Sequence, residues 1–154
     1  MADHVSIIGS QPFLRRLPAR YVERLAAMSR HISLPVGGRL FEEHAPAHSF
    51  WLIDAGQVAL DALVPGVGVV VVEKLGRGDI AGLGWLGPPY QYGFGAVCTQ
   101  PLQAYQFDTA ALRAACRQDP AFGYALFERF AAALEHRVQV TRRRLLEARS
   151  RAVA

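Results

Sequence analysis

The chain has 154 residues, of which 51% are hydrophobic and 19% are charged, so it can bury a sizeable core and is too apolar to be disordered. Its longest apolar run, from Val67 to Val72, is interrupted by Gly68 and is too short to cross a bilayer. The segment before Ile7 holds Asp3 and no basic cluster, which argues against a signal peptide, and the two cysteines fit a reducing compartment. We therefore expect one cytoplasmic domain without a membrane segment.

The formal charge of +4 is concentrated at the C-terminal end. Residues 136–154 hold six arginines against Glu147 alone, a balance of +5, whereas residues 1–135 hold 11 basic and 12 acidic side chains, a balance of −1. Such a basic segment could contact nucleic acid or an acidic partner. The alternative is a solvated helix face with cations near its C-terminus, where the helix dipole favours them.

The first predicted element is a helix over residues 17–29. Pro18 suits an early helical position, and an apolar stripe follows it at helical spacing. The stripe consists of Val22, Leu25, Ala26 and Met28.

The middle of the chain, from Ile32 to Phe107, is typical of β-structure because glycine-rich turns separate short β-rich runs. Within 57–62, Val58, Leu60 and Ala62 alternate with Gln57, Ala59 and Asp61, a period of two. Many short strands without an intervening long helix indicate an antiparallel sandwich or barrel. The predicted runs are 31–36, 50–56, 57–64, 68–75, 96–100 and 102–108.

Two helices are predicted after the strands. Asp108 can cap a helix over 109–116, and Asp119 followed by Pro120 starts a longer one that runs to about Arg149. Apolar or small residues recur along this helix at spacings of four and three, a heptad seam that predicts pairing with a second copy. The alternative is packing on the chain's own barrel, and we expect residues 122–130 to do so and the later half to face a partner. The seam is Phe127, Ala131, Leu134, Val138, Thr141, Leu145 and Ala148.

The stretch "GLGWLG" at 82–87 spells G-x-G-x-x-G, the fingerprint of a dinucleotide-binding turn. That turn requires a strand before the glycines and a helix directly after them. Here Pro88 and Pro89 stop any helix after Gly87, and the surroundings are antiparallel β-structure. The fingerprint is therefore interpreted as accidental.

Three segments carry a resemblance to a known family: "GGRLFEEHAPAHSFWLIDAGQVAL", "LGRGDIAGLGWL" and "HRVQVTRRRLLE". In this order they resemble the cyclic nucleotide-binding domain family, in particular the sensor domains of catabolite-activator-type bacterial regulators. The resemblance implies a mainly β fold with flanking helices, a double-stranded β-helix (jelly-roll) barrel plus a long C-terminal helix. It assigns residues 1–120 to the helix and barrel, and 121–154 to the dimerisation helix and basic tail. Because no helix-turn-helix is expected after that helix, we expect no sequence-specific DNA binding by this chain alone.

The second segment resembles the family's phosphate-binding cassette but lacks its charged anchors. Leu83 stands where the family has a glutamate for the ribose, and Phe94 and Gly95 precede Ala96 where the family has an arginine and a serine or threonine. If the loop is one residue longer, Gly93 fills the arginine position instead. The aromatic residues of this segment, Trp85, Tyr90, Tyr92 and Phe94, could fill the cavity themselves or line it for an apolar ligand. The predicted pocket comprises Gly82, Leu83, Gly84, Trp85, Leu86, Phe94, Gly95 and Ala96.

The expected function is that of a non-catalytic regulatory module with an altered ligand site, which signals through an unidentified protein partner. The alternatives are a working sensor for cyclic AMP or cyclic GMP and a basic-tailed accessory regulator of transcription. No catalytic motif occurs, so no enzymatic activity is expected. His44 and His48 are separated by Pro46, which argues against a helical pair of metal ligands, and no metal site is expected. No cofactor is expected either, and a bound cyclic nucleotide is the less favoured alternative. The predicted homodimer contacts are Phe127, Leu134, Val138, Thr141 and Leu145.

Overall fold

The structure of the chain is a computed structural model that describes residues 4–153. Asp3, on which part of the signal-peptide argument depends, and the outer ends of the predicted segments 1–120 and 121–154 lie outside the described residues. Within 4–153, no helix combines the length and the apolar character that a bilayer crossing requires.

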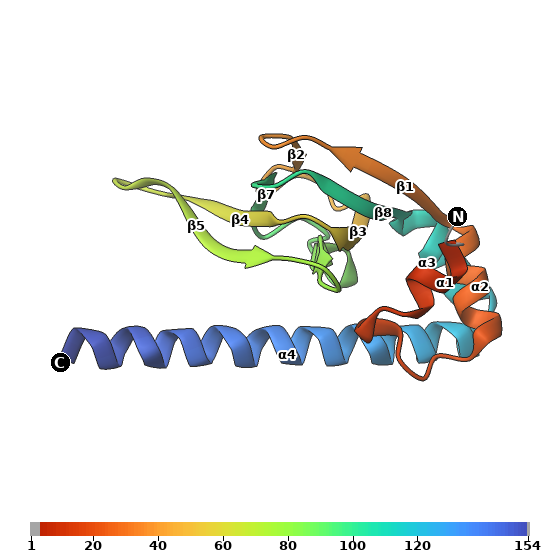
Figure 1. Ribbon diagram of the computed structural model, residues 1–154. Helices are drawn as coiled ribbons and strands as arrows, with labels where there is room; N and C mark the ends of the chain where they lie inside the picture. The colour runs from red at the N-terminus through yellow and green to blue at the C-terminus, as the bar shows by residue number, and fades with distance from the viewer. Residues whose placement is uncertain (1–3, 154) are drawn as a thin grey trace.

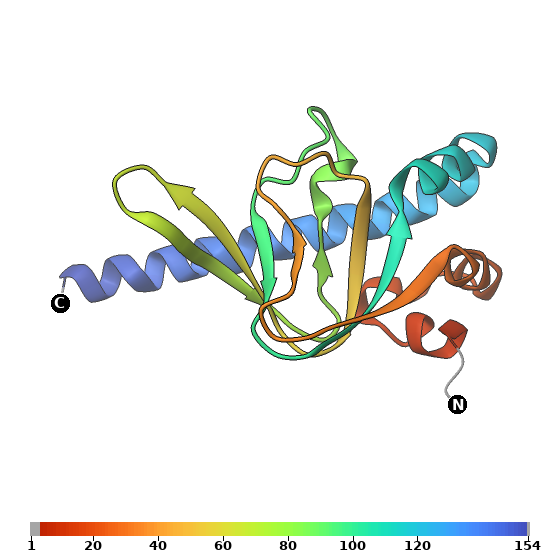
Figure 2. The ribbon, with the colours of Figure 1, turned by 90° about the horizontal axis from the view of Figure 1, so that it is seen from above.

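Within residues 4–153, eight antiparallel strands form two four-stranded sheets that face each other as a barrel (Figures 1 and 2). One sheet has the order β1-β8-β3-β6 and the other the order β2-β7-β4-β5. The predicted jelly-roll fold of the cyclic nucleotide-binding type is confirmed. The strands are β1 (Ser29–Leu34), β2 (Arg39–Phe41), β3 (Ser49–Ala55), β4 (Val58–Val64), β5 (Gly68–Leu75), β6 (Ile80–Ala81), β7 (Gly95–Cys98) and β8 (Leu102–Asp108).

The strand prediction failed where strands are very short. β6 has two residues, which pair with Trp51 and Leu52 of β3, and no period can be recognised over two residues. β2, with three residues after the turn at Gly37, was missed for the same reason. The simple alternation expected for β4 is also wrong, because Ala59 and Asp61 are as buried as Val58 and Leu60. Asp61 tolerates this burial because it pairs with an arginine, as described below.

The N-terminal elements pack at one end of the barrel (Figure 1). They are α1 (His4–Gly9), the short 3-10 turn η1 (Pro12–Leu14) and α2 (Ala19–Ala27). The predicted stripe of α2 is confirmed, with Val22, Leu25 and Ala26 buried and Met28 half-buried. Helix α1 was not predicted from the sequence, and Ile8 is its buried residue.

The C-terminal helices α3 (Thr109–Gln118) and α4 (Pro120–Val153) begin at the predicted acidic residues. The Asp108 carboxylate accepts a hydrogen bond from the Ala111 N–H at 3.0 Å, and that of Asp119 accepts one from the Phe122 N–H at 3.3 Å. Asp119 also forms a 2.7 Å ion pair with Arg24 of α2, which ties this end of α4 to the N-terminal helices.

Helix α4 runs past the whole barrel and projects beyond it on the side opposite the N-terminus (Figure 1). Its first turns bury Phe122, Leu126 and Phe130 in the core, whereas every residue from 141 to 153 is exposed. The packing of the Phe-rich first half on the barrel is confirmed.

Candidate functional site

The glycine-rich part of the cassette begins where β6 ends, in a turn that requires glycine. Gly82 has φ 92°, a left-handed backbone, and a Cβ there would lie 3.2 Å from Cε1 of Tyr92 and 3.1 Å from the Ser49 carbonyl oxygen. A 3-10 turn, η2 (Leu83–Leu86), follows and ends at Gly87. Pro88, Pro89 and then β7 come next, so no βαβ unit surrounds these glycines, and the dinucleotide fingerprint is accidental as predicted.

The interior beside Gly82 is occupied by a stack of three aromatic rings from different parts of the chain. The ring of Tyr92 lies 4.0 Å, centroid to centroid, from that of Phe41 on β2, at an interplanar angle of 19°. Trp51 of β3 also stacks on Phe41, at 5.4 Å, and its ring lies 6.2 Å from that of Tyr92. All three side chains are buried, so they pack together as part of the core.

The Tyr92 hydroxyl is fixed by the backbone of Ser49. It donates to the Ser49 carbonyl oxygen at 2.7 Å and accepts from the Ser49 N–H at 3.2 Å. Burial raises the pKa of Tyr92, while the hydrogen bond to Ser49 acts in the opposite direction. A buried phenol with both hydrogen-bonding functions satisfied is a stable filling for this space.

The other aromatic residues of the segment lie elsewhere. Trp85 is buried, but its ring packs against Phe50, Phe127 and Phe130, so it joins the cassette turn to α4 and not to the inside of the barrel. Tyr90 and Phe94 are 44% and 43% exposed, so the expectation that they could fill the cavity is wrong for these two residues.

The positions that hold the family's anchors carry no charge, and they differ in burial. Leu83 and Leu86 are half-buried on η2, and Gly84 lies between Leu83 and Trp85 on the same turn. Phe94 precedes β7 and is exposed, whereas Gly95 and Ala96 are buried in β7.

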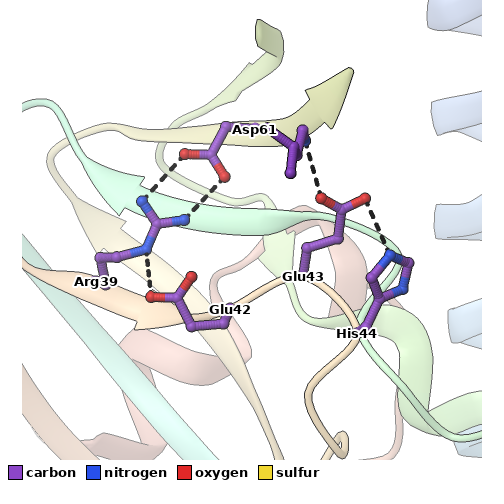
Figure 3. A network of polar contacts seen from close by, with 6 residues as sticks. Arg39, Glu42, Glu43, His44 and Asp61 are labelled. Atoms are coloured by element: carbon purple, nitrogen blue, oxygen red, sulfur yellow. Dashed lines mark hydrogen bonds and ion pairs between the residues drawn. The ribbon is translucent and has the colours of Figure 1, made fainter. Parts of the chain in front are cut away.

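A network of polar side chains surrounds Arg39 (Figure 3). Asp61 of β4 pairs with Gly95 in the sheet, and a Cβ on Gly95 would collide with the Asp61 carboxylate and the Arg39 guanidinium. Arg39 donates two hydrogen bonds to Asp61, at 2.9 and 3.1 Å, and a third contact of 2.9 Å joins it to Glu42. The hydrogen bond to Asp61 raises the pKa of Arg39, and both carboxylates contribute to the same direction.

This network has consequences for anion binding. Arg39 is the cation of this group, and two carboxylates already neutralise it. The Asp61 side chain is 8% exposed, so a phosphate at Gly95 would meet a buried negative charge. Arg39 and Asp61 were not predicted as site residues, although a lone aspartate within an apolar strand indicates that it needs a cationic partner.

The two histidines considered as metal ligands, His44 and His48, do not belong to a cluster of metal-binding side chains in the part of the chain that the structure describes. Nε2 of His44 lies 3.4 Å from Glu43, whose carboxylate also accepts a hydrogen bond from the Leu63 N–H at 3.0 Å (Figure 3). Over residues 4–153, no group of three or more His, Cys, Asp or Glu side chains is placed to hold a metal ion.

The predicted dimer contacts lie on α4 with different surroundings. Phe127 is half-buried against Trp85 of its own chain, and the hydroxyl of Thr141 donates to the Arg137 carbonyl oxygen at 2.9 Å. The other three, Leu134, Val138 and Leu145, are exposed.

The arginines of the basic segment fall into two groups. Those at 142–144, 149 and 151 are exposed, as expected of a solvated helix face. Arg137 differs, because its guanidinium turns toward the barrel and donates to the Ile80 carbonyl oxygen at 2.6 Å. Burial is the main cause that lowers the pKa of Arg137.

Solved structures that share this fold are cyclic nucleotide-binding domain proteins. A protein from Geobacter metallireducens GS-15, provisionally named a cyclic nucleotide-binding protein, is 27% identical with a TM-score of 0.74, over 83% of this chain and 92% of that one. A cyclic nucleotide-binding domain from Methylobacillus flagellatus KT is 20% identical with a TM-score of 0.81, over 94% of this chain and 81% of that one.

The sensor domain of the transcriptional regulator DNR from Pseudomonas aeruginosa is 20% identical with a TM-score of 0.68, over 88% of this chain and 91% of that one. No protein-family model matches the chain, and no curated protein matches it. The chain therefore has the fold of cyclic nucleotide-binding domains, including that of a regulator's sensor domain, and the names of these neighbours describe binding and regulation.

Proposed function

We propose that the chain is a non-catalytic regulatory module of the cyclic nucleotide-binding fold whose cassette does not hold a cyclic nucleotide, and that it acts through a partner protein. The observation that carries the proposal is Tyr92. Its ring occupies the interior beside Gly82, stacked on Phe41 and hydrogen-bonded to Ser49.

The electrostatics of the cassette support the same proposal. A cyclic phosphate that enters a pocket loses its hydration, which costs several kcal/mol unless cationic or hydrogen-bonding groups replace the water. Leu83 and Phe94 offer neither, and Arg39, the cation nearest Gly95, is already paired with Asp61 and Glu42. The loss of two such anchors costs roughly 2–5 kcal/mol in comparable interfaces.

Calorimetric titration with cyclic AMP and cyclic GMP tests the proposal. We expect no binding tighter than about 0.1 mM, which corresponds to about 5–6 kcal/mol. A micromolar dissociation constant for either nucleotide would show that the chain is a working cyclic nucleotide sensor with a non-standard pocket.

A matched variant separates the two reasons for the absence of binding. Leu83→Glu with Phe94→Arg restores the family's charged anchors but leaves Tyr92 in place. We expect this double variant not to bind, because the aromatic stack still fills the interior. If it binds cyclic AMP, only the anchors were missing and the filling of the pocket is not the cause.

We also propose that the chain forms a homodimer through the later half of α4, with Leu134, Val138, Thr141 and Leu145 in the contact. The exposed apolar surface supports this, because Val138 is 45% and Leu145 is 56% exposed. The β4–β5 hairpin projects toward the same end of the molecule as α4 (Figure 1) and adds further exposed apolar side chains. These are Leu63, Val64, Val67, Val69, Val71 and Val72. A twofold-related copy would cover both surfaces at once.

A further inference from the structure

A cavity of about 580 Å³ lies between the barrel and α4. We call it the α4 cleft. It is bounded by η1, by the end of β5 with the turn to β6, and by residues 129–144 of α4. None of the predicted pocket residues at 82–86 and 94–96 lines it. Its volume is in the range of small-molecule sites.

The charged side chains around the α4 cleft are strongly unbalanced. Two carboxylates, Glu73 and Asp79, face six cations, which leaves four positive charges, and His136 also lines the cleft. The cations are Arg15, Lys74, Arg77, Arg129, Arg137 and Arg144. Such an excess in a concave surface attracts anions, because low-dielectric walls focus the field.

The carboxylates do not neutralise this excess by direct contact. Within residues 4–153, four of the six cations have no carboxylate oxygen within 4.0 Å: Arg15, Lys74, Arg137 and Arg144. Arg77 approaches Asp54 at 4.0 Å, and Asp79 accepts a hydrogen bond from the Gly76 N–H at 2.9 Å within its own turn.

Two of the arginines are partly buried, and the lost contacts with water are not all replaced by hydrogen bonds within the protein. Nε of Arg129 is buried and has no hydrogen-bond partner among the described residues, while its Nη1 contacts Glu128 at 3.2 Å. The Arg137 guanidinium is largely buried, which lowers its pKa. Its Nη2 donates a hydrogen bond to the Ile80 carbonyl oxygen. A buried guanidinium with free N–H groups is stabilised by an oxyanion that accepts from them.

The remaining walls of the cleft are apolar. Phe13 of η1, Ile80 of β6 and Val140 of α4 all line it. The space is far larger than a single phosphate ion requires, so the chemistry of the walls suits a molecule with both an anionic group and an apolar body.

We propose that the α4 cleft binds a small organic phosphate, with the phosphate on Arg129 and Arg137 and the organic body against Phe13, Ile80 and Val140. A phosphate monoester fits better than a carboxylate because it carries close to two negative charges at pH 7, against an excess of four positive ones. Since α4 forms one wall, an occupied cleft would bias the position of α4 relative to the barrel. This inference is independent of the proposed function, because it involves none of the predicted pocket residues at 82–86 and 94–96.

Phenyl phosphate serves as the probe, in calorimetric titration of the full chain at fixed salt. We expect saturable 1:1 binding that is at least about tenfold weaker in Arg129→Gln and in Arg137→Gln, because each removes a charge-assisted hydrogen bond. Arg143→Gln is the matched control: it removes the same charge from the same helix at an exposed position outside the cleft, so its affinity should change less than about twofold. A second readout is the Nε–H resonance of Arg129 in ¹⁵N-arginine-labelled protein, which should shift on saturation.

Several results would overturn the proposal. One is the absence of binding up to about 10 mM phenyl phosphate, and another is an equal loss of affinity in all three variants, which would indicate unspecific attraction by the basic helix. Equal affinity for inorganic phosphate and phenyl phosphate would refute the role of the apolar wall. If Arg129→Gln does not fold, Arg144→Gln at the exposed rim of the cleft replaces it, with an expected loss of about threefold.

Discussion

Replacement of Tyr92 by alanine tests the central packing argument. The Tyr92 side chain is 4% exposed, stacks on Phe41 and contacts Trp51, and its hydroxyl makes two hydrogen bonds to Ser49. Truncation of a buried aromatic side chain costs about 3–5 kcal/mol, through the lost transfer free energy and the cavity left behind. We therefore expect Tyr92→Ala to lower the free energy of unfolding by about 3–5 kcal/mol.

Two companion variants divide this cost and control for it. Tyr92→Phe keeps the ring and loses only the hydroxyl, so we expect a loss of about 0.5–1.5 kcal/mol. Tyr124→Ala removes the same side chain from an exposed position on α4, 74% accessible, and should change the stability by no more than about 0.5 kcal/mol.

The assay is urea denaturation at equilibrium, followed by tryptophan fluorescence, with all variants compared at constant m-value. Trp51 reports directly on this site because its ring lies 6.2 Å from that of Tyr92. A loss below about 1 kcal/mol for Tyr92→Ala would refute the reasoning, since the ring would then not be an essential part of the core.

The pH dependence of stability gives an independent check on the same residue. Because burial raises the pKa of Tyr92 in the folded state, the unfolded chain loses this proton first as pH rises. The contribution of Tyr92 is thus fully present below the ordinary tyrosine pKa of about 10 and is lost as pH rises through the higher folded value. Burial also raises the pKa values of Tyr105 and Cys98, so these residues contribute to the alkaline loss of stability as well. The test is therefore a comparison: Tyr92→Phe should lose less stability at alkaline pH than the unmodified chain.

Two further changes test local structure. His44 has φ 68°, a left-handed backbone that favours glycine, so His44→Gly should raise the stability by up to about 1 kcal/mol, and a fall in the thermal midpoint would contradict this. Asp108→Ala removes the cap of α3 and should lower the free energy of unfolding by about 1 kcal/mol, or the thermal midpoint by about 2–4 °C. Asp108→Asn keeps an acceptor for the Ala111 N–H and should lose much less stability. Equal losses in the two variants would exclude the cap as the cause.

The fold could be predicted from the sequence because its information is distributed along the chain. Glycine-punctuated β-runs, the acidic caps at Asp108 and Asp119, and three motifs in order each agree with one architecture. Elements below about four residues, such as β2 and β6, were missed because a period cannot be recognised over so short a stretch.

The candidate site was less predictable because it depends on contacts between distant residues. The departures at Leu83 and Phe94 are visible in the sequence, but which aromatic fills the interior is not. Tyr92 meets Phe41 and Trp51 only when β2 and β3 come together, so the sequence could not separate it from the exposed Tyr90. Likewise, Arg137 belongs to the basic segment in the sequence, and only the packing of α4 turns it toward Ile80.

The later half of α4 provides the last prediction, which concerns assembly. Leu134 and Val138 are 39% and 45% exposed, and burial of apolar surface contributes about 25 cal/mol per Å², so a second copy along this seam would stabilise the helix. The exposed arginines at 142–144 would then approach their symmetry mates in a parallel pair, a repulsion that salt weakens.

We therefore expect a dimer at micromolar concentration whose dissociation constant falls as salt is added. Val138→Asp places a carboxylate in the seam and should give a folded monomer, whereas Gln139→Asp, the same charge one position away from the seam, should remain dimeric. Light scattering at two salt concentrations, with circular dichroism to confirm folding, measures all three proteins. A monomeric unmodified chain, or a dimer that persists in Val138→Asp, would place the contact on another face, with the apolar β4–β5 hairpin the next surface to mutate.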